Sequence, residues 1–328
     1  MPFHYTAYGL SIASQRALPE LSTLEESGAL LGHAPDVEIV WNELPAPPTP
    51  SEWLQVQGEV AVLHFARVCT FRVSQGRLIE VSPAQGAEEN TVRLPLLGAA
   101  TAILLHQRGL FALHSSAVSI RGRAALFIGE KGQGKSTLAS ALYGRGHELL
   151  ADDIAVITQP ASQGSAAAST CSGSAGLAGS GKSGGLVVRP GFPQFKLVPD
   201  SLKATLNIEE HELPHVGALV DKRAHRVRER FCAQEVPLAR VYVLGIGGWE
   251  LSRPSAQQAL AHVLSQSYAA RFGQKLLHGP SAARHLAMCS RLVSGGFVRL
   301  LQRPSDLEFL GETARRIEDD IEHDVAQS

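Results

Sequence analysis

The stretch that decides the fold runs from Arg123 to Ile157 and reads RAALFIGEKGQGKSTLASALYGRGHELLADDIAVI. Within it, Gly129-Glu-Lys-Gly-Gln-Gly-Lys-Ser-Thr137 matches the pattern G-x-x-x-x-G-K-[ST], whose backbone N–H groups surround nucleotide phosphates. The apolar run at 124–128 predicts a buried strand before this loop, and apolar residues at helical spacing follow it. The sequence therefore predicts a phosphate-binding loop at a helix N-terminus, where free N–H groups favour an anion.

The positions of this loop have predicted roles in binding ATP. Lys135 is expected to contact the β- and γ-phosphates, and Ser136 is expected to offer its hydroxyl to Mg²⁺. The residues predicted to bind the nucleotide are those of the loop and the first helical turn: Gly129, Lys131, Gly132, Gln133, Gly134, Lys135, Ser136 and Thr137.

The chain contains a second match to the same pattern, at Gly176-Leu-Ala-Gly-Ser-Gly-Lys-Ser183. It lies inside residues 161–185, a tract made mostly of alanine, serine and glycine, with no apolar strand before it. Such a composition is typical of a flexible linker and cannot form a core. We interpret this match as a chance one, within a flexible insertion.

Composition limits the classes of partner. A net charge of -1 and a pI of about 6.9 argue against a general nucleic-acid binder, which is normally basic. The chain has no run of eighteen apolar residues and no apolar segment near its N-terminus, so we expect neither export nor a membrane span. Its four cysteines are far apart and form no C-x-x-C pair, which favours a reducing cytoplasm.

The chain divides into two predicted parts. Residues 1–95 consist of short alternating or apolar runs separated by turn signals, which predicts a small β-rich module. Residues 96–328 are expected to form the nucleotide-binding domain. A helix is predicted at 94–109, and the region from 255 to 323 is predicted to be largely helical, with Arg299 on one of its helices.

Two adjacent acidic residues follow the loop's helix in the sequence. The apolar run 147–157 predicts a second strand, in which Asp152 and Asp153 would point in opposite directions. A P-loop protein uses such an acid to hold Mg²⁺ opposite the loop hydroxyl, and we expect a functional pair here. His114 lies in the apolar run 110–120, predicted as the hairpin partner of the strand at 124–128; from the residues alone a buried structural histidine is favoured.

The most basic segment is 221–230, which includes Lys222 and Arg223. A solvated surface explains such a run in most proteins. Beside an anionic site, Lys222 and Arg223 could also hold the phosphates, because arginine makes bidentate contacts to phosphate. Both interpretations stay open, and these two residues complete the predicted nucleotide-binding set.

Residues 113–157 resemble the catalytic core of HPr kinase/phosphorylase, in particular the small HPr-kinase-like proteins found beside bacterial peptide-modification genes. These residues read LHSSAVSIRGRAALFIGEKGQGKSTLASALYGRGHELLADDIAVI. A weaker similarity extends to 187–197, to Lys222-Arg223 and to 238–244. The resemblance implies that Asp152 is the general base for a serine hydroxyl, that Asp153 and Ser136 are metal ligands, and that His114 lies near the phosphates. Val187 stands where the family's metal-binding glutamate would align, so neither the phosphorylase reaction nor HPr as substrate is implied.

Together these observations predict an α/β protein: an HPr-kinase-like P-loop core of mixed sheet and helices, preceded by a small β-rich module. The predicted reaction transfers the γ-phosphoryl group of ATP, with Mg²⁺, to a serine of a peptide or small protein. Asp152, Lys135 and His114 are the predicted catalytic residues. An ATP hydrolase, a small-molecule kinase and a nucleotide-dependent peptide-binding module without catalysis are the alternatives, and a homo-oligomer stays open.

Overall fold

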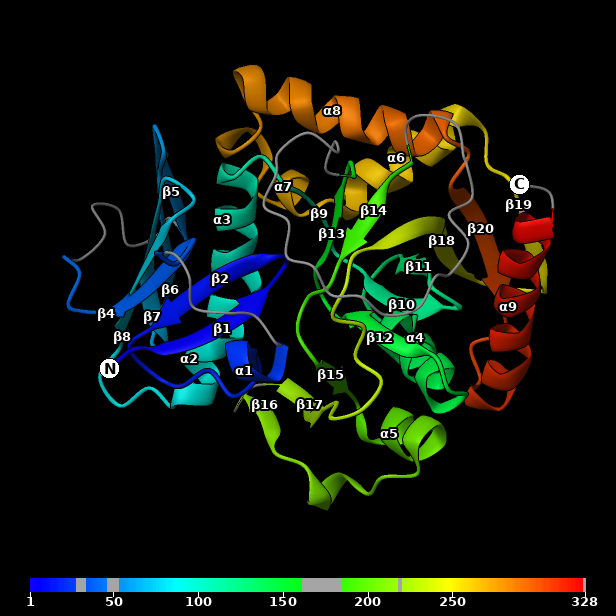
Figure 1. Ribbon diagram of the computed structural model, residues 1–328, viewed down its shortest axis with the longest axis horizontal. Helices are drawn as coiled ribbons and strands as arrows, with labels where there is room; N and C mark the ends of the chain where they lie inside the picture. Colours follow the sequence, from blue (N-terminus) through cyan, green and yellow to red (C-terminus); the bar gives the residue numbers. More distant parts are fainter. Residues whose placement is uncertain (28–33, 46–52, 161–184, 218–219, 327–328) are drawn as a thin grey trace, which may run out of the picture.

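The computed structural model describes residues 1–27, 34–45, 53–160, 185–217 and 220–326. These residues form a mixed α/β fold, as the sequence predicts, and its strands make three sheets (Figure 1). The second loop-like match at 176–183 and nearly all of the predicted insertion at 161–185 lie outside the described residues. No helix in the described ranges is long and apolar enough to cross a membrane.

The first sheet has eight strands in the order β3-β1-β2-β4-β8-β7-β6-β5. Its strands alternate buried and partly exposed residues, the pattern of a sheet that covers a core with one face. Their bounds are β1 Phe3–Ala7, β2 Leu10–Ser14, β3 Ser22–Thr23, β4 Val37–Trp41, β5 Leu54–Gln57, β6 Val60–Phe65, β7 Cys69–Ser74 and β8 Leu78–Pro83. A short helix, α1 Leu24–Ser27, follows β3.

The predicted helix at 94–109 is longer than expected and contains a π-helical turn. It consists of α2 Glu89–Pro95, η1 Leu96–Ala100 and α3 Thr101–Gln107. Its apolar residues share one core with the strands of the first sheet, and α3 also contacts β9 Phe111–Leu113, so it stands between the two larger sheets (Figure 1). The predicted domain boundary at 95/96 therefore falls within a continuous helical segment, and it stays a prediction.

The second sheet carries the predicted loop. Its order is β12-β10-β11-β18-β14-β13-β9, with β20 paired to β18 and β19. β10 and β11 form the predicted antiparallel hairpin, and β11 pairs in parallel with β18. The bounds of its strands after β9 are β10 Ser116–Ile120, β11 Arg123–Ile128, β12 Glu148–Ala151, β13 Ala155–Thr158, β14 Val187–Arg189, β18 Val236–Ile246, β19 Glu250–Ser252 and β20 Val298–Arg303.

Two expectations about this sheet are wrong. The run 147–157 is not one strand, because β12 pairs with β10 while β13 pairs with β9 and β14, and the chain bends between them at Asp152 and Asp153. Asp153 has a φ of 74°, so the two aspartates do not alternate as they would in an extended strand. Arg299 lies on β20 rather than on a helix, since this segment completes the sheet beside β18.

Helices cover both faces of the second sheet, and a third sheet lies beside it. The third sheet has the order β15-β17-β16. In Figure 1, α6 and α8 cross the top of the view and α9 lies at the right. The remaining bounds are α4 Lys135–Gly144, β15 Gln194–Leu197, α5 Pro199–Leu206, η2 Glu210–Glu212, β16 His215–Gly217, β17 Val220–Arg226, α6 Ala256–Gln266, α7 Tyr268–Arg271, η3 Gly273–Lys275, α8 Gly279–Ser294, η4 Leu307–Phe309 and α9 Leu310–Ala326.

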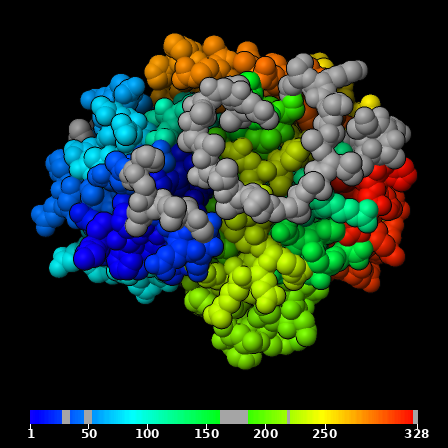
Figure 2. Space-filling model, viewed as in Figure 1, coloured from blue at the N-terminus to red at the C-terminus, as the bar shows by residue number. Residues whose placement is uncertain are grey.

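The N-terminal strands are packed against the middle of the chain. Figure 2 shows the blue N-terminal part in contact with the yellow-green residues of the third sheet. Arg226 on β17 donates to the carbonyl of Leu21 at 3.0 Å and pairs with Glu26 at 2.9 Å. At the β1–β2 turn, the Tyr8 N–H donates to the carbonyl of Pro190 at 2.7 Å. The N-terminal part therefore contacts β17 of the third sheet and the segment before β15, and we call this contact the seam.

Candidate functional site

The loop between β11 and α4 has the backbone of a phosphate cradle. Its glycines 129, 132 and 134 have φ values of 150°, 91° and 75°, which other residues adopt with strain. A Cβ on Gly129 would lie 2.2 Å from Gln133 Oε1 and 3.2 Å from the carbonyl oxygen of Leu244, so a side chain there would displace Gln133. Gly134 is the N-cap of α4 and brings no side chain to the free N–H groups of the first turn. Those groups are left to bind an anion.

The side chain of Lys135 lies inside this loop. Its Nζ donates to the carbonyl oxygens of Gly129 at 2.7 Å and Glu130 at 3.2 Å, and the residue is buried. Burial lowers the pKa of Lys135, and the charges of Arg271 and Lys222 add to this effect. An ammonium that is buried and close to other cations is stabilised by a bound anion.

A row of three polar side chains joins the loop to the first aspartate. Ser136 Oγ lies 3.5 Å from Ser116 Oγ, and the Ser116 hydroxyl donates to Asp152 Oδ1 at 2.6 Å. The backbone N–H of Lys196 donates to Asp152 Oδ2 at 3.0 Å. Asp152 is only 3% exposed. Burial and the neighbouring Asp153 raise its pKa above the usual value, although both hydrogen bonds oppose this shift.

Asp153 has the opposite electrostatic setting. Lys196 Nζ donates to Asp153 Oδ2 at 2.6 Å, and both side chains are largely buried. Burial opposes ionisation, but the Lys196 charge and its hydrogen bond outweigh it and hold the pKa of Asp153 well below its usual value, with a further contribution from Lys222. Asp153 is therefore ionised at neutral pH, while Asp152 is the carboxylate with the greater proton affinity.

His114 lies on the far side of Asp153. Its Nδ1–H donates to the backbone carbonyl of Asp153 at 3.1 Å, which leaves Nε2 as the acceptor of a neutral ring. The ring meets that of Tyr268 edge-on, with the centroids 5.6 Å apart. Burial lowers the pKa of His114 to about 4. His114 is thus neutral at pH 7. Its hydrogen bond to the Asp153 carbonyl stabilises the chain bend that carries the two aspartates.

The other predicted binding residues divide into two groups. The Lys222 charge acts to lower the pKa values of Lys135, Asp153 and Asp152, although burial and Asp153 keep that of Asp152 raised. Lys222 therefore contributes to the potential at the site. Arg223 is turned to other partners, since its guanidinium binds Glu210 at 2.8 Å and His215 at 2.9 Å. 

Within the loop, Lys131, a predicted nucleotide-binding residue, is exposed. The Gln133 side chain accepts from the N–H of Glu130 at 2.7 Å and so braces the loop. The Thr137 hydroxyl points away, 2.8 Å from that of Ser201 on α5. Gln133 and Thr137 therefore make loop and helix contacts.

Four further residues, which the sequence analysis did not single out, belong to the site. Ser116 and Lys196 contact the aspartates directly. Arg271 lies over the Tyr268 ring at 5.4 Å, and its charge lowers the pKa values of Lys135 and His114. Arg303 on β20 donates to the carbonyl of Gln133 at 2.8 Å and so supports the loop from behind. Signals existed for Ser116 and Lys196, because both lie in segments of the resemblance, at 113–157 and 187–197.

The donor set fits magnesium and a nucleotide. Mg²⁺ prefers oxygen ligands and takes one or two from carboxylates, with the rest from phosphates and water. Ser136 supplies a hydroxyl, and Asp152 and Asp153 supply carboxylates close to the loop. In the described part of the chain no three histidine, cysteine or acidic residues form a metal cluster. The loop glycines and Lys135 match the phosphate groups that such an ion accompanies.

Comparison with known proteins gives one local similarity in sequence. No family model matches the chain. Over 46 residues the chain is 50% identical to "Putative HPr kinase/phosphorylase 2" of Oceanobacillus iheyensis, which is 14% of this chain and 15% of that protein. The chain therefore matches only a small part of the length of this relative. The HPr(Ser) kinase/phosphatase of Coxiella burnetii aligns with 66% of this chain and 97% of its own, at 11% identity and a TM-score of 0.29. Over those 46 residues the chain resembles the HPr kinase/phosphorylase family, and this confirms the resemblance predicted from the sequence.

Proposed function

We propose that this protein is a kinase that transfers the γ-phosphoryl group of ATP to the hydroxyl of a serine in a peptide or small protein. The observation that carries the proposal is the connection between the loop and the acid pair. Ser136 of the phosphate loop, Ser116 and Asp152 form a continuous polar row, and Asp153 follows with its own cation, Lys196. A phosphate loop beside a proton acceptor is the arrangement that phosphoryl transfer to a hydroxyl needs.

The electrostatics support a division of roles between the aspartates. Asp152 has the raised pKa, which suits a general base, and its carboxylate would accept the proton of the serine hydroxyl. The serine oxygen then bonds to the γ-phosphorus while the bond between that phosphorus and the β–γ bridging oxygen breaks, and ADP leaves. Asp153 stays ionised and, with Ser136, would hold Mg²⁺, whose charge neutralises the phosphate oxygens.

The cations around the loop support binding of a triphosphate. Lys135 lies within the loop, and the charges of Lys222 and Arg271 act on it. Fixed cations of this kind stabilise the charge that develops on the transferred phosphoryl group. We propose that Lys135 and Lys222 contact the phosphates, and that His114, being neutral, positions the aspartate bend rather than carrying a proton.

A transfer assay tests the proposal. The purified chain is incubated with Mg²⁺, ATP labelled in the γ-phosphate and serine-containing peptides. Label on a peptide serine supports the kinase; release of free phosphate alone would indicate an ATP hydrolase, and nucleotide binding without turnover would indicate a binding module. Lys135→Ala is expected to abolish labelling while the circular-dichroism spectrum stays unchanged. Labelling that survives in this variant would contradict the assigned site.

A further inference from the structure

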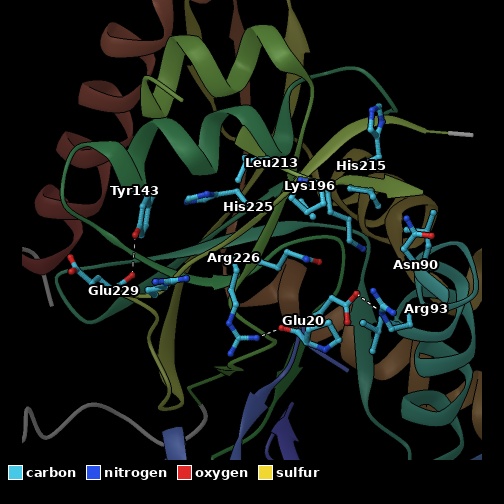
Figure 3. Close-up of a pocket in the computed structure, with 18 residues that line it drawn as sticks. Glu20, Asn90, Arg93, Tyr143, Lys196, Leu213, His215, His225, Arg226 and Glu229 are labelled. Carbon is cyan, nitrogen blue, oxygen red and sulfur yellow. Dashed lines mark hydrogen bonds and ion pairs between the residues drawn. The ribbon is translucent and has the colours of Figure 1, made fainter. Parts of the chain in front are cut away.

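A large cavity lies between the third sheet and the N-terminal part of the chain, where residues 19–20 and the helical segment α2–η1 line it. Its volume is about 750 Å³, within the range of roughly 300–1,000 Å³ typical of ligand sites. Figure 3 shows side chains from both sides of the seam facing one another across it, with Glu20 and Arg93 on one side and His225 and Arg226 on the other. Both the N-terminal part and the loop-bearing part of the chain would therefore contact an occupant.

The cavity is connected to the proposed catalytic site through Lys196. This residue lines the cavity, while its Nζ donates to Asp153 at 2.6 Å and its backbone N–H donates to Asp152 at 3.0 Å. Burial opposes the charge of Lys196, but Asp153 and Asp152 raise its pKa, and Glu20 adds a smaller effect from the cavity side. Lys196 therefore links the cavity lining to both aspartates.

The charges of the lining favour an anion. Four cationic side chains line the cavity, Arg93, Lys196, Arg226 and Arg228, against two acidic ones, Glu20 and Glu229. Three of the four cations already have acidic partners: Arg93 has Glu20, Arg226 has Glu26 and Lys196 has Asp153. Arg228 is exposed and makes no ion pair with any residue in the described ranges. A carboxylate entering the cavity would find Arg228 unpaired, and it could share Lys196 with Asp153.

We infer that this cavity binds an acidic segment of the acceptor polypeptide, close to the serine that receives the phosphoryl group. The inference rests on the proposed kinase function and adds the substrate class. It also gives the N-terminal part of the chain a role, because Glu20 and Arg93 form one wall of the site. Phosphorylation would then select serines whose neighbours carry carboxylates.

Two matched peptides test the inference. Each carries a fluorescent label and one serine, flanked in the first by three glutamates and in the second by three glutamines. Binding to the full chain is measured by fluorescence anisotropy without nucleotide, at low and physiological salt. The glutamate peptide is expected to bind at least about tenfold more tightly at low salt, with the difference shrinking as salt screens the charges. Equal binding of both peptides, or equal competition by free glutamate, would overturn the inference.

Two variants and one control locate the binding. Arg228→Glu reverses an exposed charge at the cavity and is expected to remove most of the preference for the glutamate peptide. Ala224→Trp fills the cavity and should weaken binding of both peptides, with its fold checked by thermal melting. Arg253→Glu changes the net charge equally, on an exposed residue outside the cavity lining, and should leave the preference intact. An effect of Arg253→Glu equal to that of Arg228→Glu would refute the cavity as the site.

The same peptides separate this inference from the kinase proposal. If the glutamate peptide binds through Arg228 but never becomes labelled from ATP, the cavity assignment stands and the kinase proposal fails. If the peptides are phosphorylated on serine and kcat/KM is the same for both and for Arg228→Glu, the kinase proposal stands and the cavity assignment fails.

Discussion

The buried ion pair between Lys196 and Asp153 gives the sharpest prediction about stability. Nζ and Oδ2 are 2.6 Å apart, and the side chains are 7% and 25% exposed. Removing one partner of a buried pair leaves an uncompensated charge and costs about 3–5 kcal/mol. Because Asp153 keeps some contact with solvent, we expect Lys196→Met to lower the free energy of unfolding by about 3 kcal/mol. 

A double-mutant cycle measures the pair itself. Asp153→Asn in the Lys196→Met background removes the orphaned carboxylate, so the double variant should recover about 1–2 kcal/mol relative to the sum of the single changes. The assay is urea unfolding followed by far-ultraviolet circular dichroism at pH 7. Glu312→Gln on α9, where the ion pairs are exposed, is the matched control and should cost less than about 1 kcal/mol. A cost for Lys196→Met below that of the control, or a coupling of zero, would refute the reasoning.

Three further predictions follow from single groups. Tyr8→Phe should not reduce stability, because the buried Tyr8 hydroxyl makes no hydrogen bond with the described residues. Tyr5→Phe should lower the free energy of unfolding in urea by about 1–2 kcal/mol, since the Leu18 N–H loses its acceptor. His114 has a pKa of about 4 in the folded protein, so its imidazole binds a proton in the unfolded chain first as pH falls. The free energy of unfolding should therefore drop by about 3 kcal/mol from pH 6.5 to 4. In thermal melts across that range, His114→Gln should reduce the dependence of stability on pH. Turnover should fall on acidification at a pH above the usual aspartate pKa, because Asp152 must be unprotonated to act and its pKa is raised; a pH–rate profile flat down to pH 4 would contradict this.

The loop and its flanking elements were predictable because their signals are local. An apolar strand, glycines with positive φ and a helix N-terminus follow one another in the sequence, so β11, the loop and α4 could be read off 123–144. The β10–β11 hairpin was equally predictable from the sequence, since its strands are separated by a short turn at 121–122. In these segments the sequence pattern and the packing agree.

What could not be predicted depends on contacts between distant residues. The break between β12 and β13 arises because these two strands pair with different neighbours, β10 and β9. No glycine or proline between Ala151 and Ala155 marks this break in the sequence. Lys196 meets Asp153 only because β15 is placed beside the bend by its pairing with β17. Arg299, a buried arginine on β20, interrupts an apolar run, and for this reason the sequence pattern did not predict a strand there.

The measurement that tests the central claim most directly compares nucleotide binding and phosphoryl transfer in Asp152→Asn. If Asp152 is the general base beside a loop that binds ATP, the variant should bind Mg²⁺-ATP within about threefold of the unmodified chain in calorimetric titration. Its transfer of label to a serine peptide should be slower by at least about 100-fold, the range that general base catalysis supplies. Near-normal transfer by Asp152→Asn, or no binding of ATP by the unmodified chain, would contradict the account.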